Sequence, residues 1–154
     1  MEPSTLVDGS PPLRLLRDVV LLSRLVQQLI DPPLRRELGM SSKEIYVLRS
    51  LTLGIKRPGA IARRLNLGPP SVSRAIDMLE DRGFVERCTR HDDGRATEVA
   101  ITDAGMQAID TALRVVEAAY AEAYADLDPA LIQRGIEVVE DLLEAMGSEA
   151  TKLS

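Results

Sequence analysis

The chain has 154 residues, of which 45% are hydrophobic and only 3% aromatic, and its formal net charge is −5 at pH 7. This length suits one core-bearing domain with additional helical segments and is too short for two large domains. A single cysteine and a single histidine exclude an intramolecular disulfide and a zinc site built from these ligands.

The amino-terminal segment predicts an arm followed by a long helix. Glu2 and Asp8 make the start unlike a secretory signal, so we expect a cytoplasmic protein. Residues 1–12 are rich in proline and glycine and predict a flexible arm. Apolar residues at helical spacing then predict a helix over residues 13–38, with an apolar band too wide for one core face. The segment Asp31-Pro32-Pro33 should break or kink this helix.

The next segments predict three shorter helices. A capping box formed by Ser41 and Glu44 marks the start of the first of them. Pro58 is suited to the first turn of a second helix of about two turns. A third helix runs from Pro70 to Arg82 and ends at Gly83, a residue that favours the left-handed conformation. The second and third of these helices are short and joined by a tight turn that contains glycine, so they match a helix-turn-helix unit.

The third of these helices has one apolar and one polar face. The apolar face consists of Val72, Ala75, Ile76 and Leu79. Ser71, Ser73 and Arg74 then fall on the outer face. An arginine here can donate two hydrogen bonds to guanine, and the serines can bond bases or phosphates. The alternative is that Arg74 is an ordinary solvated side chain and that the serines are helix caps.

A charged hairpin follows the helix-turn-helix unit. Residues 84–89 and 96–102 predict strands, separated by the polar stretch 90–95. A hairpin at this place is typical of the wing of winged-helix proteins, whose tip can insert an arginine into the narrow minor groove of DNA. Thr102 predicts the N-cap of a long helix, and Pro129 opens a last one.

In this order, the elements resemble the MarR family of winged helix-turn-helix regulators from about Leu13 to Met146. The motifs that carry the resemblance are Gly83-Phe84-Val85-Glu86-Arg87, Asp93-Gly94-Arg95 and Ile101-Thr102-Asp103-Ala104-Gly105. Ile101 stands where the family usually has leucine. The resemblance implies a mainly α fold with a small β-hairpin wing. It places the DNA-binding domain at residues 41–103 and dimerisation helices at 13–38 and 104–147.

The resemblance also implies roles for residues of the wing. Arg95 would be the arginine that enters the minor groove, and Asp93 would orient it through a charge-assisted hydrogen bond. Arg87 and Arg90 become candidate phosphate contacts. The alternative for Asp93 and Arg95 is a surface ion pair, and for Arg87 and Arg90 it is ordinary solvated charge.

The distribution of charge permits DNA binding although the chain is acidic overall. The segment from Lys56 to Arg95 contains nine basic and six acidic residues and is +3, whereas the remainder is −8. Screening limits the attraction of phosphate to about 8 Å at physiological salt, so a basic middle segment can act on its own.

These observations lead us to expect a sequence-specific DNA-binding transcription regulator. As the resemblance implies, it would act as a homodimer on a pseudo-palindromic operator, as a repressor released by a small aromatic or phenolic effector. Tyr46 and Arg49 are candidate wall residues for that effector. A winged-helix dimer that acts as a protein adaptor without sequence-specific DNA binding is the alternative. We expect no catalytic residues, metal, cofactor or membrane partner, because the sequence has no nucleophile and base pattern, phosphate-binding glycine loop or metal-ligand cluster.

Overall fold

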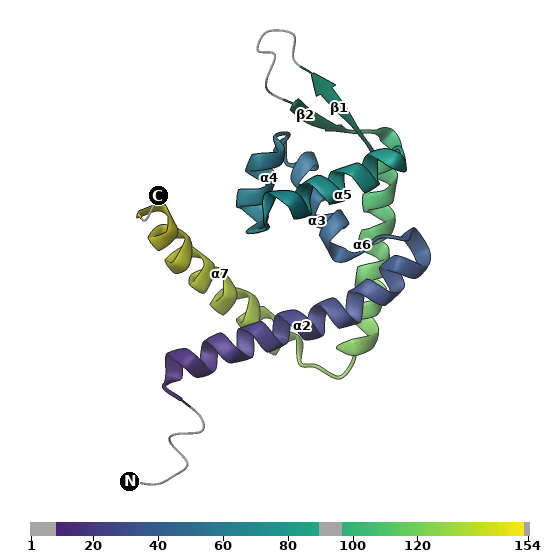
Figure 1. The fold of residues 1–154 in the computed structure, drawn as a ribbon. Coiled ribbons are helices and arrows are strands. Elements are labelled where there is room, and N and C mark those ends of the chain that lie inside the picture. The colour runs from purple at the N-terminus through teal and green to yellow at the C-terminus, as the bar shows by residue number, and fades with distance from the viewer. Residues whose placement is uncertain (1–8, 90–96, 153–154) are drawn as a thin grey trace, which may run out of the picture. The chain divides into compact units, whose positions relative to one another are not determined.

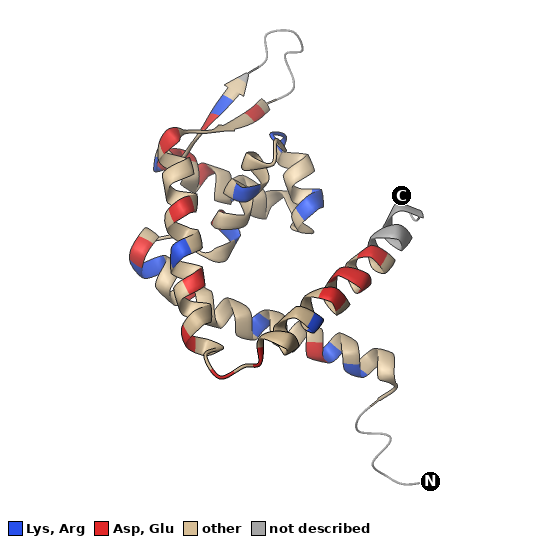
Figure 2. Cartoon of the chain, turned by 180° about the vertical axis from the view of Figure 1, so that it is seen from behind, with Lys and Arg blue, Asp and Glu red and all other residues tan. Residues whose placement is uncertain are grey.

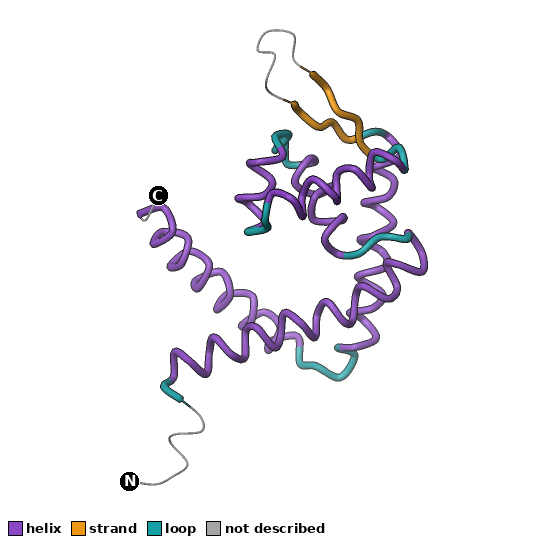
Figure 3. The backbone as a smooth tube through the Cα atoms, in the orientation of Figure 1, coloured by secondary structure: helices purple, strands orange, loops and turns teal. Residues whose placement is uncertain are grey.

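The computed structural model describes residues 9–89 and 97–152. It is mostly helical with one two-stranded antiparallel hairpin, which confirms the fold class expected from the sequence (Figure 1, Figure 3). The chain forms two compact units, the first ending at Ala119 and the second beginning at Tyr120. The elements in chain order are α2 (Pro11–Leu38), α3 (Ser42–Thr52), α4 (Pro58–Leu65), α5 (Pro69–Asp81), β1 (Val85–Thr89), β2 (Thr97–Ile101), α6 (Asp103–Ala123) and α7 (Pro129–Lys152).

Helix α2 continues through its two internal prolines. Of the break or kink expected at Asp31-Pro32-Pro33, the break does not occur, and the helix runs from Pro11 to Leu38, after which Gly39 adopts the left-handed conformation with φ 61°. Each proline lacks the N–H that would bond the carbonyl four residues earlier, so these two bonds are missing. Ile30 and Leu34, on either side of the prolines, are both buried. We infer that this packing keeps the chain helical where the two hydrogen bonds are missing.

The start of α3 is fixed by its own residues and by α2. The Glu44 carboxylate accepts hydrogen bonds from the backbone N–H of Ser41, at 2.7 Å, and from the Ser41 hydroxyl. The Oδ1 atom of Asp31, on α2, accepts a hydrogen bond of 2.8 Å from the N–H of Ser42. Because the first N–H groups of a helix have no partner within the helix, these carboxylates satisfy donors that would otherwise be free. Asp31 therefore links α2 to the first turn of α3.

The core of the first unit lies among α3, α4, α5, the hairpin and the first half of α6. All four apolar residues expected on the inner face of α5 are buried, which confirms that prediction. Buried residues of the same core cluster on other elements include Val47 and Leu48 of α3, Ile61 of α4, Val85 of β1 and Val99 of β2. The inner face of α5 is thus surrounded by apolar side chains from four other elements.

The hairpin is attached to the core at its base. Its antiparallel register pairs Val85 with Ile101 and Thr89 with Thr97. On the other edge of β2, the N–H of Val99 donates to the carbonyl of Lys56 at 2.9 Å. The Thr102 hydroxyl accepts from the N–H of Gly105 at 3.1 Å, which confirms Thr102 as the cap of α6.

The second unit contains the end of α6 and helix α7. The rings of Tyr120 and Tyr124 stack with their centroids 5.3 Å apart. Helix α7 carries exposed large apolar residues on successive turns, namely Leu131, Ile132, Ile136, Val138, Val139, Leu143 and Met146. No helix in the described part of the chain has both the length and the apolar content needed to cross a membrane.

Gly105, in the first turn of α6, lies close against Phe84 and Ile101 at the base of the hairpin. A Cβ atom built on Gly105 would collide with the backbone carbonyl of Phe84 and would lie 2.7 Å from Cγ1 of Ile101. A backbone carbonyl cannot turn aside as a flexible side chain can. This contact gives a steric reason for glycine in the Ile101–Gly105 motif that the sequence alone did not supply.

We expect Gly105→Ala to lower the free energy of unfolding by about 1–3 kcal/mol, as forced overpacking does. Urea denaturation of the purified variant measures this change. Gly59→Ala on α4 is the matched control, because a Cβ at Gly59 would meet nothing within 4 Å. The control should be neutral or stabilising by up to about 1 kcal/mol, and equal effects of the two substitutions would contradict the close approach at Gly105.

Candidate nucleic-acid interface

The outer face of α5 holds the polar residues expected from the sequence. A left-handed residue, Asn66 with φ 50°, ends α4 and turns the chain toward α5. Burial of the inner face of α5 leaves Ser73 and Arg74 exposed and Ser71 half-buried. The structure therefore brings these three side chains to one side of a helix whose opposite side is buried in the core.

The amino-terminal end of α5 offers few free backbone donors. Pro69 and Pro70 occupy its first two positions and have no N–H. The next two N–H groups, of Ser71 and Val72, both donate to the carbonyl of Gly68, at 2.9 and 3.3 Å. Polar contacts to a ligand at this end must therefore come from side chains, that is, from the serine hydroxyls and the guanidinium of Arg74.

Arg74 and Arg87 differ in their surroundings. Within the part of the chain that the structure describes, Arg74 takes part in no ion pair. Arg87, on β1, is bound to Asp77 of α5 at 2.5 Å and also to Glu80 of the same helix. The hydrogen bond to Asp77, assisted by the charge of Glu80 and opposed by partial burial, raises the pKa of Arg87 above its ordinary value. Arg87 was singled out as a candidate phosphate contact, and its guanidinium here contacts two carboxylates.

The remaining candidates from the wing, Arg90, Asp93 and Arg95, lie outside the described residues. Their assignment stays a prediction. The described part of the hairpin ends at Thr89 and resumes at Thr97, and these two residues pair across the strands.

The structure adds a basic depression that the sequence analysis did not single out. A cavity of about 450 Å³ is lined by Arg57, Arg63 and Thr97, together with the first residues of α4. Arg57 is 3.9 Å from Glu98 and remains largely exposed. The count of basic residues between positions 56 and 95 includes both arginines, but only the fold shows that they line one depression beside Thr97, at the start of β2.

Charge is distributed unevenly over the described elements (Figure 2). Helix α4 carries Arg63 and Arg64 and no acidic residue. Helix α7 carries Glu137, Glu140, Asp141 and Glu144 along one stretch, with Arg134 before them. The net negative charge is thus unevenly distributed along the chain. Helix α7 is acidic, whereas α4, in the helix-turn-helix unit, is basic.

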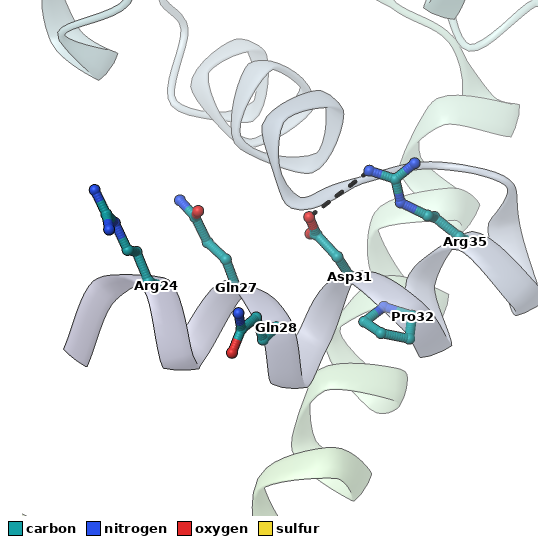
Figure 4. A pocket seen from close by; sticks show the side chains of 6 residues that line it. All are labelled: Arg24, Gln27, Gln28, Asp31, Pro32 and Arg35. Atoms are coloured by element: carbon teal, nitrogen blue, oxygen red, sulfur yellow. Dashed lines mark ion pairs between the residues drawn. The ribbon is translucent and has the colours of Figure 1, made fainter. Parts of the chain in front are cut away.

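A second depression lies between α2 and α3. It has a volume of about 350 Å³, and its wall includes Tyr46 but not Arg49, the other candidate wall residue. Its polar lining comes from Gln27, Asp31, Arg35, Ser41, Ser42 and Lys43, and its apolar lining includes Leu65 and Leu67. An adjoining open pocket on α2 shares Asp31 and Arg35, whose ion pair of 3.9 Å is drawn in Figure 4.

Comparison with known proteins shows which family part of this arrangement resembles. Residues 43–97 match the model of the MarR family. An uncharacterised HTH-type transcriptional regulator of Mycobacterium bovis is 37% identical over 75 residues, which are 49% of this chain and 52% of the relative. The chain therefore spans about half the length of this curated relative. Its name is that of a regulator and not of an enzyme.

Solved structures share the fold at low sequence identity. The transcriptional regulator BldR from Sulfolobus solfataricus superimposes with a TM-score of 0.79 at 21% identity, covering 94% of this chain and 99% of that one. A cysteine-to-serine mutant of MarR from E. coli, solved with operator DNA, gives a TM-score of 0.74 at 20% identity, covering 90% of this chain and 99% of that one. These structures show that the chain has a winged helix-turn-helix fold, and residues 43–97 within it match the MarR-family model.

Proposed function

We propose that this protein regulates transcription in the cytoplasm by binding operator DNA as a homodimer. The observation that carries the proposal is the outer face of α5, where an arginine without an ion-pair partner among the described residues lies beside two serines. The opposite face of the helix is buried, so this surface is held rigidly. The similar MarR of E. coli has been solved in complex with operator DNA, which supports the same class of ligand.

Each part of the surface has a distinct role in this proposal. Arg74 reads a guanine edge in the major groove, and Ser71 and Ser73 bond bases or phosphates. Arg95, oriented by Asp93, enters the minor groove. Arg90 contacts the phosphate backbone from the wing, and Arg57 and Arg63 do so from the depression beside α4.

The proposed dimer covers apolar surface that a single chain leaves in water. Helix α2 exposes Leu13, Leu15, Leu16, Val19, Val20, Leu21, Leu22 and Leu25, each at least 44% exposed. Apolar patches of this extent are rare on monomers and are typical of interfaces. Pairing of two chains by a two-fold axis places two copies of α5 side by side and predicts half-sites about one helical turn of DNA apart.

Repression relieved by a small ligand completes the proposal. The depression between α2 and α3 offers the ring of Tyr46 and the cations of Lys43 and Arg35, which suit a small aromatic or phenolic anion. A ligand there contacts both the helix proposed to dimerise and the helix-turn-helix unit. Preferential binding to one arrangement of these two parts shifts the population toward that arrangement and changes the spacing of the half-sites.

We expect Arg74→Ala and Arg95→Ala both to weaken binding to the preferred duplex, by roughly tenfold to a hundredfold for Arg74. Only Arg74→Ala should relax the base preference, because only Arg74 is proposed to read a base edge in the major groove. Selection of sites from random duplex DNA at near-physiological salt, followed by fluorescence anisotropy on the selected duplex, measures both effects.

Two outcomes of this experiment count against the proposal. An equal loss on every sequence from both substitutions would remove Arg74 from the base-reading role. Failure of the wild-type protein to enrich any sequence at any salt concentration would favour the alternative function of a protein adaptor.

We expect Leu22→Asp to raise the dimer dissociation constant by at least about a hundredfold. In a two-fold dimer the substitution removes two leucine side chains that the interface would bury. Burial of each contributes roughly 1.5–3 kcal/mol to the free energy of association. Sedimentation velocity over a concentration series measures the change. Leu53→Asp is the matched control, since Leu53 is 51% exposed against 54% for Leu22 but lies beyond the end of α3. A monomeric wild-type protein, or equal effects of both variants, would contradict dimerisation through α2.

A further inference from the structure

Arg87 bridges the wing to two consecutive turns of α5. Its Nη2 atom contacts Oδ1 of Asp77 and its Nη1 atom contacts Oε2 of Glu80, three residues further along the helix. The backbone N–H of Arg87 also donates to Oε1 of Glu80, at 3.2 Å. Side chains three residues apart lie on the same face of a helix. One guanidinium therefore holds two carboxylates that lie one above the other on α5.

These contacts argue against Arg87 as a phosphate contact. Both terminal nitrogens of the guanidinium are engaged, and the Arg87 side chain is 33% exposed. The three groups together carry a net charge of −1, because one cation is shared by two carboxylates. A phosphate that approached Arg87 would also approach Asp77, whose side chain is 56% exposed.

The contacts suit a role in which Arg87 fixes the orientation of α5 about its own axis. Arg87 pairs in register with Val99, which is fully buried and whose N–H is bonded to the carbonyl of Lys56. The position of Arg87 is therefore fixed relative to the core. Asp77 lies three residues after Arg74, so the clamp acts on the turn of α5 next to the proposed base reader. A planar guanidinium fork fixes the direction of both carboxylates, as a point charge does not.

We propose that Arg87 is a positioning residue that holds α5 in its reading orientation by clamping Asp77 and Glu80, and that it does not contact phosphate. The inference rests on the proposed function, since an orientation matters only if α5 reads DNA. It assigns Arg87 a different role from the other arginines of this surface. Loss of Arg87 should harm the selection among sequences, whereas loss of a phosphate contact should weaken binding to all of them.

The test compares Arg87→Ala and Arg87→Lys with Arg63→Ala as the matched control. Arg63 is an exposed arginine on α4, and its loss removes one positive charge without touching the clamp. For each protein, the dissociation constants for the selected duplex and for a scrambled duplex are measured from about 50 to about 200 mM salt, the range over which phosphate contacts are most evident. Circular dichroism and urea denaturation check that each variant is folded, and Arg87→Lys serves alone if Arg87→Ala does not fold.

We expect Arg87→Ala to lower the preference for the selected over the scrambled duplex by about tenfold, comparable to the loss of one well-placed base contact. Affinity for the scrambled duplex and the slope of log affinity against log salt should stay near the wild-type values. Arg87→Lys should also lose most of this preference, since one ammonium does not reproduce the fork. Arg63→Ala should weaken both duplexes alike and reduce the salt slope by about 0.9.

Two results would overturn the inference. If Arg87→Ala weakens both duplexes equally and lowers the salt slope by about 0.9, Arg87 is a phosphate contact. If Arg87→Lys retains the wild-type preference, the fork geometry is not needed. Failure of the proposed function has a different signature, because the wild-type protein would then show no preference for any duplex before a substitution is made.

Discussion

The burial of one face of α5 is the constraint on which the rest of the structure depends. Val72, Ala75, Ile76 and Leu79 are each at most 2% exposed and are surrounded by apolar side chains of other elements. Because helix geometry fixes the angle between residues, burying these four determines which residues face outward. The exposure of Arg74 and Ser73 follows from this packing. A surface that reads DNA requires rigid support of this kind, since small displacements misplace hydrogen-bond donors.

Polar contacts at the ends of the elements join the helix-turn-helix unit to its neighbours. Asp31 connects α2 to the start of α3 through the N–H of Ser42. The Thr102 hydroxyl bonds the carbonyl of Gly83 at 2.7 Å and accepts from Gly105, so it joins the end of α5 to the start of α6. Each contact also satisfies a backbone group that would otherwise lack a partner. These ties connect the proposed reading surface to α2, the helix proposed to dimerise, and to α6.

The net charge of the chain does not show which contacts the individual charged residues make. The charge of +3 between positions 56 and 95 counts every basic residue alike. In the structure Arg87 is bound to two carboxylates, and Arg82 lies over the ring of Phe84 at 4.9 Å. Each of these arginines interacts with the protein itself. The charge available for the proposed binding of DNA is therefore smaller than the sequence count indicates.

The sequence by itself determined the elements and the faces of the helices, because apolar spacing, the Ser41–Glu44 cap and Gly83 are local signals. It also placed Ser71, Ser73 and Arg74 on the outer side of α5. Only the tertiary structure decided that α2 continues through Pro32, where Ile30 and Leu34 on either side of the prolines are buried. It also decided that Gly105 meets the carbonyl of Phe84 and that Arg87 meets Asp77 and Glu80. Such contacts join residues of different elements, and their geometry depends on how those elements pack.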